Sequence, residues 1–312
     1  MQPSIVFMGT PDFAVAPLLA LHAAAFKVIL VVTQPDRPKG RGRIPAPPPV
    51  KEAALRLGYT VAQPVKVRDP AFVARLNELE PDFIVVVAFG QILPLHVLQI
   101  PKFGAVNIHA SLLPRYRGPA PIQWAVIRGE HQTGITTMLM DSGVDTGDIL
   151  LQSSTPIRAD ETAGQLHDRL SHLGAQLLVS TLIKLIEGSV APQPQNHAQA
   201  SYAPLLKKTD GHIHWHQPAG RLDAFVRAMT PWPGAFCHWR GRLLKILKAH
   251  PLEGVDTQAA PGTVIESFPD ELRVAAQPGA LAIDELQGES GKRLSAKDFL
   301  RGHDLAPGTL LT

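Results

Sequence analysis

Cysteine is nearly absent from this sequence, because Cys237 is the only one among its 312 residues. A single thiol cannot form an internal disulfide, and it fits a reducing compartment. Cys237 lies between Phe236 and His238, so we expect it to pack as a small apolar side chain rather than to act as a nucleophile. Disulfide-stabilised scaffolds are therefore excluded.

Long apolar runs are also missing. None approaches the roughly twenty residues that a membrane span requires, and the first run, residues 5–8, is short and lacks a basic leader. We therefore expect no secretory signal, no membrane association and a cytoplasmic location. Gly9, Thr10 and Pro11 follow this run where a G-x-G-x-x-G sequence would indicate a dinucleotide. A strand-to-helix turn with Thr10 as N-cap is expected instead.

Hydrophobic residues make up 45% of the chain and charged residues 18%, an ordinary balance for a globular protein. Because 312 residues exceed one typical domain, two domains are expected. Strand-like and helix-like segments alternate through the first half and end in a long amphipathic helix over residues 162–186. This alternation is typical of an α/β fold with a doubly wound sheet.

The second half of the chain has a different pattern. Residues 191–206 lose periodicity and contain three prolines, as an interdomain linker would. A helix is expected over 220–229, and short strands over 235–239, 243–248, 262–265 and 272–275 favour a small barrel. We therefore predict a first domain over residues 1–190, a linker over 191–206 and a second domain over 207–312.

The net charge of +3 hides an asymmetry. Residues 201–250 hold eight Lys or Arg against Asp210 and Asp223, giving +6, whereas residues 251–290 hold eight acids against Arg273, giving −7. A basic surface on the second domain would suit a polyanionic partner, although such a run of charge is usually only a solvated face.

Residues 105–118, AVNIHASLLPRYRG, contain the main candidate site. A short apolar strand carries Asn107 and His109 two residues apart, so the strand period points both side chains to one face. A lone buried histidine is commonly a satisfied core residue, but two polar side chains on one buried strand need partners or a ligand. Ligands of open α/β sheets bind beyond the carboxyl ends of strands, where this stretch turns.

A carboxylate follows in residues 141–148, DSGVDTGD, which end an apolar strand. Asp145 could complete a trio with Asn107 and His109, or it could serve only as a turn residue.

These stretches, together with GTPDFA at residues 9–14 and TQPDRPKGRGR at 33–43, resemble the folate-dependent formyltransferase family over essentially the whole chain. The resemblance implies a Rossmann-like formyltransferase domain followed by a small OB-like β-barrel domain. It also implies transfer of the formyl group of 10-formyltetrahydrofolate, a co-substrate, to the free amino group of methionyl initiator tRNA in translation initiation. We expect a monomer that needs no metal.

The resemblance assigns site residues as well. Asn107, His109 and Asp145 are the implied catalytic trio. The implied tetrahydrofolate site comprises two short runs, Ser111, Leu112, Leu113 and Pro114, and Phe89, Gly90 and Leu93. Phe13 is a candidate wall of the methionine pocket, unless it is simply a core aromatic residue.

Residues 34–49 show no periodicity, which is unusual for so long a segment in a compact domain. Four basic residues, Arg37, Lys39, Arg41 and Arg43, stand against Asp36, and glycines alternate with them. The segment has the composition of an arm that reaches for phosphates, with a plain linker as the alternative. The resemblance places it against tRNA.

Asn107 and His109 can supply hydrogen-bond donors to the oxyanion that forms when an amine attacks a formyl carbon. Asp145 can fix the histidine or take the amine proton. Three functions remain in competition. They are formylation of methionyl-tRNA, the same chemistry on a small amine such as an amino sugar or a purine precursor (or formyl hydrolysis), and noncatalytic RNA binding. The second should lack an RNA-reaching arm and the third should have lost the trio, so the presence of both features favours the first. His212, His214 and His216 could mimic a metal site, but no nearby carboxylate or cysteine completes it.

Overall fold

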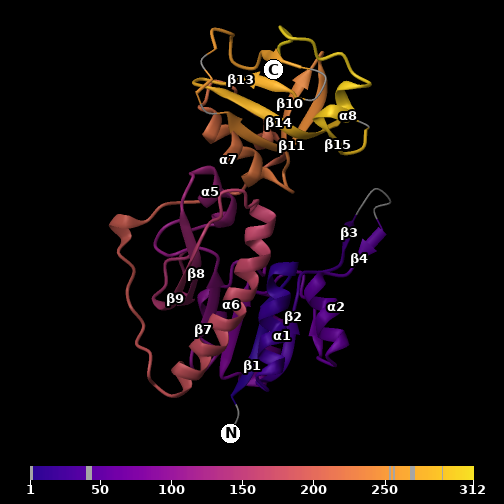
Figure 1. The fold of residues 1–312 in the computed structure, drawn as a ribbon. Coiled ribbons are helices and arrows are strands. Elements are labelled where there is room, and N and C mark those ends of the chain that lie inside the picture. Colours follow the sequence, from indigo (N-terminus) through magenta and orange to yellow (C-terminus); the bar gives the residue numbers. More distant parts are fainter. Residues whose placement is uncertain (1–2, 40–43, 253, 256, 268–270, 290) are drawn as a thin grey trace. The chain divides into compact units, whose positions relative to one another are not determined.

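The structure is a computed structural model that describes residues 3–39, 44–252, 254–255, 257–267, 271–289 and 291–312. The chain divides into two compact units (Figure 1). Unit 1 comprises Met1–Pro119, Gln132–Pro156 and His167–Ala203, and unit 2 comprises Ala120–His131, Ile157–Leu166 and Pro204–Thr312. Two segments of the first half of the chain therefore pack with the second unit.

The sheet of unit 1 has the strand order β5-β2-β1-β6-β7-β8-β9. The strands are β1 (Ser4–Gly9), β2 (Lys27–Val32), β5 (Val61–Ala62), β6 (Phe83–Val87), β7 (Ala105–His109), β8 (Gln132–Leu139) and β9 (Ile149–Pro156). The first five are parallel, and β8 and β9 are each antiparallel to the preceding strand. The chain builds outward from β1 and then returns to β6 beside it. The doubly wound topology is confirmed, and its switch point lies between β1 and β6.

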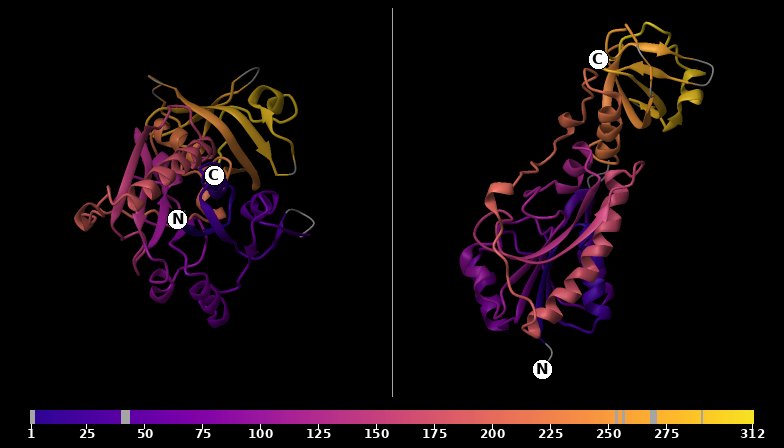
Figure 2. Two further views of the ribbon diagram at one scale, coloured as in Figure 1. Left: turned by 90° about the horizontal axis from the view of Figure 1, so that it is seen from below. Right: turned by 60° about the vertical axis from the view of Figure 1, so that its left-hand side comes forward.

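Helices cover both faces of this sheet (Figure 2). They are η1 (Asp12–Ala14), α1 (Val15–Ala23), α2 (Pro49–Arg56), α3 (Pro70–Leu79), α4 (Leu95–Leu98) and α6 (Ala163–Ile186). On one face Ala105 of β7 packs in a buried cluster with Leu76 of α3 and Val97 of α4. On the other, Ile108 lies beside Gly174 of α6. Because side chains alternate along a strand, Asn107 and His109 share the α3 and α4 face with Ala105.

Unit 2 is an antiparallel sheet of order β10-β11-β14-β13-β12, with β15 paired to β14. Its elements are α5 (Pro121–Ile127), η3 (Lys208–Gly211), α7 (Ala219–Met229), β10 (Ala235–Trp239), β11 (Arg242–Leu252), β12 (Val264–Glu266), β13 (Arg273–Ala275), β14 (Ala280–Gly288), β15 (Leu294–Ser295) and α8 (Ala296–Leu300). The segment 308–312 joins the two ends of the sheet. Leu311 N donates to Gly262 O before β12, and Thr312 exchanges two backbone hydrogen bonds with His238 of β10. This pairing closes the small barrel that the sequence predicted.

The core of unit 2 contains Trp215, Cys237, Ile246 and Leu311, all less than 5% exposed. Burial raises the pKa of the Cys237 thiol to about 12, which suits a packing role rather than a nucleophile. All four tryptophans of the sequence belong to unit 2. Tryptophan fluorescence therefore reports on this unit alone.

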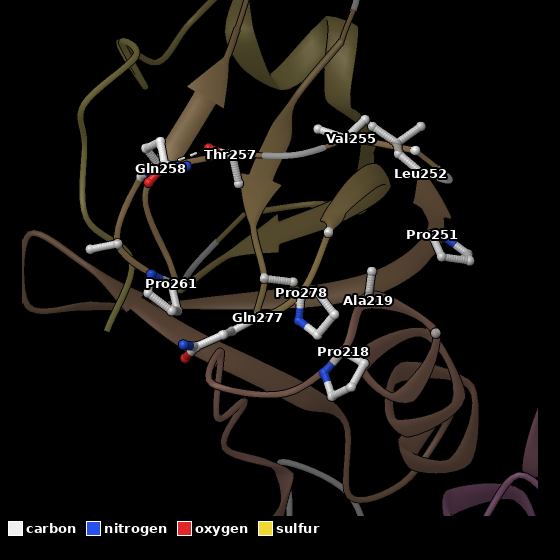
Figure 3. Close-up of a pocket in the computed structure, with 16 residues that line it drawn as sticks. Pro218, Ala219, Pro251, Leu252, Val255, Thr257, Gln258, Pro261, Gln277 and Pro278 are labelled. Carbon is white, nitrogen blue, oxygen red and sulfur yellow. Dashed lines mark hydrogen bonds between the residues drawn. The ribbon is translucent and has the colours of Figure 1, made fainter.

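Unit 2 also contains a pocket of about 980 Å³. Figure 3 shows Pro218, Pro251, Pro261 and Pro278 around it, together with Gln258 and Gln277. Among the described residues that line the pocket none is charged, and none is a predicted site residue. The described lining of the pocket therefore presents no cation to a phosphate.

None of the helices described here is long and apolar enough to cross a membrane. Within the same residues, no group of three histidine, cysteine or carboxylate side chains is placed to hold a metal ion. His212 instead packs its ring against His214, Phe236 and His238.

Barrel closure can be tested at Leu311, which is 1% exposed, with the neighbouring Leu310, which is 52% exposed, as the control. We expect Leu311→Ala to lower the free energy of unfolding of unit 2 by about 2–4 kcal/mol, because it removes buried methyl groups and leaves a cavity. Leu310→Ala should change it by about 0.5 kcal/mol or less. Urea titration followed by tryptophan fluorescence measures both, and equal midpoints for the two variants would contradict the packing.

Candidate active site

Strand β7 presents Asn107 and His109 near its carboxyl end. Asn107 pairs with Val86 of β6 and with Met138 of β8, and His109 pairs with Thr136 of β8. Asn107 is 8% exposed and His109 6%. With a strand on either side, β7 has little freedom to shift, so both side chains are held by the sheet rather than by a loop.

The Asn107 side chain makes no hydrogen bond to any residue that the structure describes. Placing an amide in an apolar environment without a partner costs about 1–3 kcal/mol by protein mutational data. Such a group in a nearly buried position indicates a place where a ligand completes the hydrogen bonding. The amide N–H of Asn107 is thus available to an oxygen of a bound molecule.

The imidazole of His109 lies between a carbonyl and a carboxylate. Its Nε2 is 2.9 Å from Tyr116 O, and its Nδ1 is 3.6 Å from Asp145 Oδ2. Because a carbonyl oxygen can only accept a hydrogen bond, Nε2 carries a hydrogen and donates a hydrogen bond to Tyr116 O. Nδ1 faces the carboxylate beyond normal hydrogen-bond distance, and it is the nitrogen left for a ligand.

Asp145 adopts a left-handed backbone conformation with φ of 53°, which is uncommon for a residue with a side chain. Its Oδ2 accepts a 2.8 Å hydrogen bond from Gly118 N. The same turn is fixed by Asp141, whose Oδ1 accepts from Gly143 N and Thr146 Oγ1. A Cβ at Gly147 would lie 1.8 Å from Leu139 O, so only glycine fits there. The turn thus places a carboxylate that is 17% exposed beside His109.

The run Ser111–Pro114 is tied to the sheet. Ser111 is fully buried, and its Oγ donates to Arg115 O at 2.6 Å. Thr136 Oγ1 donates to Ser111 O and accepts from Leu113 N, and Gln152 Nε2 donates to Leu113 O. The Ser111 hydroxyl and the buried Leu113 therefore shape the turn from inside, whereas Leu112 and Pro114 are half-buried.

The second predicted folate run follows β6, the strand next to β7. Phe89 and Leu93 are 2% and 3% exposed and belong to the buried cluster of α3 and α4, whereas Gly90 is exposed. Phe89 O accepts from Thr10 Oγ1 at 2.8 Å and from Gln34 Nε2 at 3.3 Å. The expectation that Thr10 is an N-cap was wrong, because Pro11 holds that position and the Thr10 hydroxyl binds Phe89 instead. The loops after β1 and β6 are thereby joined.

Phe13 is 6% exposed and makes an edge-to-face contact with His167 of α6, with ring centroids 5.2 Å apart. Its carbonyl accepts a hydrogen bond from Ser171, also on α6. The ring is thus part of the packing between η1 and α6. Its assignment to a methionine pocket stays a prediction.

The basic arm is partly regular. The sequence indicated no structure over residues 34–49, but β3 (Arg37–Lys39) and β4 (Ile44–Ala46) form a short antiparallel ladder. Asp36 at its base binds Lys51 and Gln63, and these hydrogen bonds hold the pKa of its carboxyl below the usual value. The exposed Arg37 donates to Gln34 at 3.1 Å. Arg41 and Arg43 lie outside the described residues.

The basic residues of the +6 segment 201–250 differ in their surroundings. Arg227 is paired with Asp223 at 2.9 Å, and Arg221 donates to the carbonyl of Arg128. Arg240 lies 3.8 Å from Asp304, an exposed pair worth at most about 1 kcal/mol. Arg221 and Arg227 therefore have structural partners within unit 2, and a role of the others toward RNA stays a prediction.

Two residues at the site were not found from the sequence. Gln195 is 5% exposed in the segment predicted as a linker, and its side chain bonds the turn of Asp145. Arg117 donates to Gln195 Oε1. Arg117 lies within residues 105–118, the main candidate stretch of the sequence. Gln195 stands alone among prolines and polar residues, and no spacing marks it.

The comparisons with known proteins agree along the chain. Residues 3–182 match the model of the formyl transferase family, and residues 205–304 match the model of its C-terminal domain. The methionyl-tRNA formyltransferase of Citrifermentans bemidjiense is 53% identical, over 98% of this chain and 96% of that protein. The one from Pelobacter propionicus is also 53% identical, over 99% of this chain and 96% of that protein.

A solved structure supports the fold. The N-formyltransferase from Helicobacter canadensis, in complex with folinic acid and dTDP-3-aminofucose, aligns with a TM-score of 0.68 at 19% identity. The alignment covers 94% of this chain and 100% of that chain. On the family-model matches and the identity to its relatives, the chain belongs to the formyl transferase family, in which its relatives from Citrifermentans bemidjiense and Pelobacter propionicus are named methionyl-tRNA formyltransferases.

Proposed function

We propose that the protein transfers the formyl group of 10-formyltetrahydrofolate to the free amino group of methionyl initiator tRNA, as a step of translation initiation. The name shared by relatives at 53% identity over nearly full length supports this substrate pair. The observation that carries the chemistry is the nearly buried Asn107 amide without a hydrogen-bond partner among the described residues, beside His109 and Asp145.

Asn107 donates to the formyl oxygen as negative charge develops on it. A donor fixed on a strand between two others needs no reorganisation when the amine attacks, and removal of one such donor typically costs about 10²–10³ in kcat. The low exposure of Asn107 keeps water from competing for this hydrogen bond. The residue therefore favours the tetrahedral intermediate over the bound substrate.

His109 and Asp145 act together on charge and protons. With Nε2 donating to Tyr116 O, Nδ1 of His109 becomes the second donor toward the developing oxyanion when the ring is protonated on both nitrogens, a charged form that the neighbouring Asp145 carboxylate favours. Asp145 Oδ2 is held by Gly118, and Oδ1, which makes no hydrogen bond to the described residues, accepts the amine proton directly or through a water. The proton must finally reach N10 of the folate, which leaves as a neutral amine.

The tRNA approaches through sequence-independent charge contacts from the arm and from the basic segment 201–250. Ser111–Pro114 and the loop with Phe89, Gly90 and Leu93 supply the folate site, and Phe13 the methionine pocket. The protein acts as a monomer in the cytoplasm, where initiator tRNA is used. Sedimentation of the purified protein alone and with tRNA tests the monomer.

The substrate pair is tested by transfer of radiolabelled formyl from 10-formyltetrahydrofolate. We expect labelling of charged initiator tRNA and no labelling of free methionine, amino sugars or uncharged tRNA. Labelling of an amino sugar at higher kcat/KM than initiator tRNA would move the function to a small-amine formyltransferase. RNA binding with no transfer to any amine would leave only the noncatalytic function.

The catalytic trio is tested by Asn107→Ala, His109→Ala and Asp145→Ala. Each variant should lower kcat by about a hundredfold or more with little change in tRNA affinity, because each group acts on transition-state charge. Thermal unfolding of each variant controls for misfolding. If two of the three retain near wild-type kcat, the trio is wrong.

The arm is tested by Arg41→Ala, with the exposed Arg56→Ala at the end of α2 as the matched control. We expect the arm variant to lose roughly 1–3 kcal/mol in kcat/KM for tRNA, the size of one charged contact to a base or phosphate. Arg41→Lys should recover only part if the contact is bidentate. Folate affinity should stay unchanged in all three variants. A wild-type kcat/KM for tRNA in Arg41→Ala would mean that the arm is only a spacer.

A further inference from the structure

Gln195 is a buried residue in an otherwise exposed segment. It is 5% exposed, whereas Pro194 and Asn196 on either side are exposed. The segment has no helix or strand at this point, so backbone pairing does not explain why the side chain turns inward. A buried amide in such a place is stable only if its polar atoms find partners.

The Gln195 amide uses its full hydrogen-bonding capacity. Its Nε2 donates to Asp145 O at 2.9 Å and to Gly147 O at 2.7 Å. Its Oε1 accepts from Arg117 Nε at 3.1 Å and from Arg117 Nη2 at 2.7 Å. Two donor hydrogens and two lone pairs are all that a side-chain amide offers, so this position suits glutamine and no residue that only accepts or only donates.

These bonds connect the two loops around the His109 and Asp145 pair. On one side they hold the backbone of Asp145 itself, in its left-handed conformation. On the other they hold Arg117, whose neighbour Gly118 donates to Asp145 Oδ2 at 2.8 Å. A strained backbone conformation of this kind persists only where surrounding contacts hold it, and the hydrogen bonds of Gln195 are such contacts.

The backbone of the same segment fixes the position of Gln195. Ile149 and Gln193 exchange two backbone hydrogen bonds just before it. Further on, Arg117 N donates to Ser201 O at 2.8 Å, and Ala203 N donates to Arg117 O at 2.7 Å. The segment is thus attached on both sides of Gln195, and the side chain has a rigid support rather than a free linker.

We propose that Gln195 is a positioning residue for the formyl transfer, which holds the Asp145 carboxylate in place beside His109. The inference rests on the proposed function, and it assigns a role in that function to a segment that connects the two predicted domains. Gln195 acts through the backbone of Asp145 and through Arg117, and it does not itself touch the reacting atoms.

The first test compares Gln195→Met with Gln193→Met, a control in the same segment whose side chain is exposed and whose structural bonds are backbone only. Gln195→Met should lower kcat roughly tenfold to a hundredfold, the range expected when a reacting group is misplaced by about 1 Å, and leave KM for the folate unchanged. Gln193→Met should match the wild type. A wild-type kcat in Gln195→Met would overturn the proposal.

A second variant separates the two halves of the hydrogen-bond set. Gln195→Glu keeps an acceptor for Arg117 but has no N–H for the carbonyls of Asp145 and Gly147, so its kcat should fall as far as that of Gln195→Met. Combination with Asp145→Ala completes a double-mutant cycle, in which Gln195→Met should add little further loss. A full additional loss in the Asp145→Ala background would mean that Gln195 acts by another route.

A third readout does not depend on activity. Hydrogen exchange of the Gly118 amide, which donates to Asp145, should accelerate at least tenfold in Gln195→Met and stay unchanged in Gln193→Met. Unchanged exchange in Gln195→Met overturns the positioning role even if kcat falls. Should the wild-type protein transfer no formyl group to any amine, the proposed function fails, while this exchange measurement still decides whether Gln195 holds the Asp145 turn.

Discussion

The hydrogen bond from Gly118 N to Asp145 Oδ2 is the contact on which the candidate site depends. It joins the loop after β7 to the turn after β8, at the point where the sheet changes from parallel to antiparallel pairing. Strand β8 runs antiparallel to β7, from Thr136 opposite His109 to Leu139 opposite Val106, so the turn after β8 starts at the amino end of β7. This turn must fold back along β7 for Asp145 to reach His109. The strands hold His109 in place, and the loop contacts orient the Asp145 carboxylate beside it.

The sequence predicted the parts of this site that follow from periodicity. A spacing of two residues on an apolar strand was enough to place Asn107 and His109 on one face, and the structure has them there. That Asp145 lies beside His109 needed the family resemblance, because periodicity says nothing of how a turn folds back. Gln195 escaped prediction altogether, since its importance comes from four hydrogen bonds across the fold and from no local pattern.

The fold was predictable to a similar degree. The helix predicted over residues 220–229 is present as α7, which begins one residue earlier. The prediction of an arm without regular structure was wrong in detail. Strands β3 and β4 are three residues each, too short for an alternation to be visible, and they contain Pro38 and Pro45. Strand β14 was missed because Ala280–Ile283 is a continuous apolar run that becomes polar at Asp284, so it lacks regular alternation.

Barrel closure by the segment 308–312 determines how late in synthesis unit 2 can complete its pairing. His238 of β10 pairs with Thr312, so the first strand of this sheet waits for residues made more than seventy positions later. Pairings between such distant residues form late, and until then both edges of the sheet are open to other chains. Unit 1 completes its own packing earlier, when the segment up to Ala203 has been made. All residues of unit 1 are therefore synthesised before the barrel of unit 2 can close, and the open barrel is the stage of synthesis at which its sheet edges are most exposed to pairing with other chains.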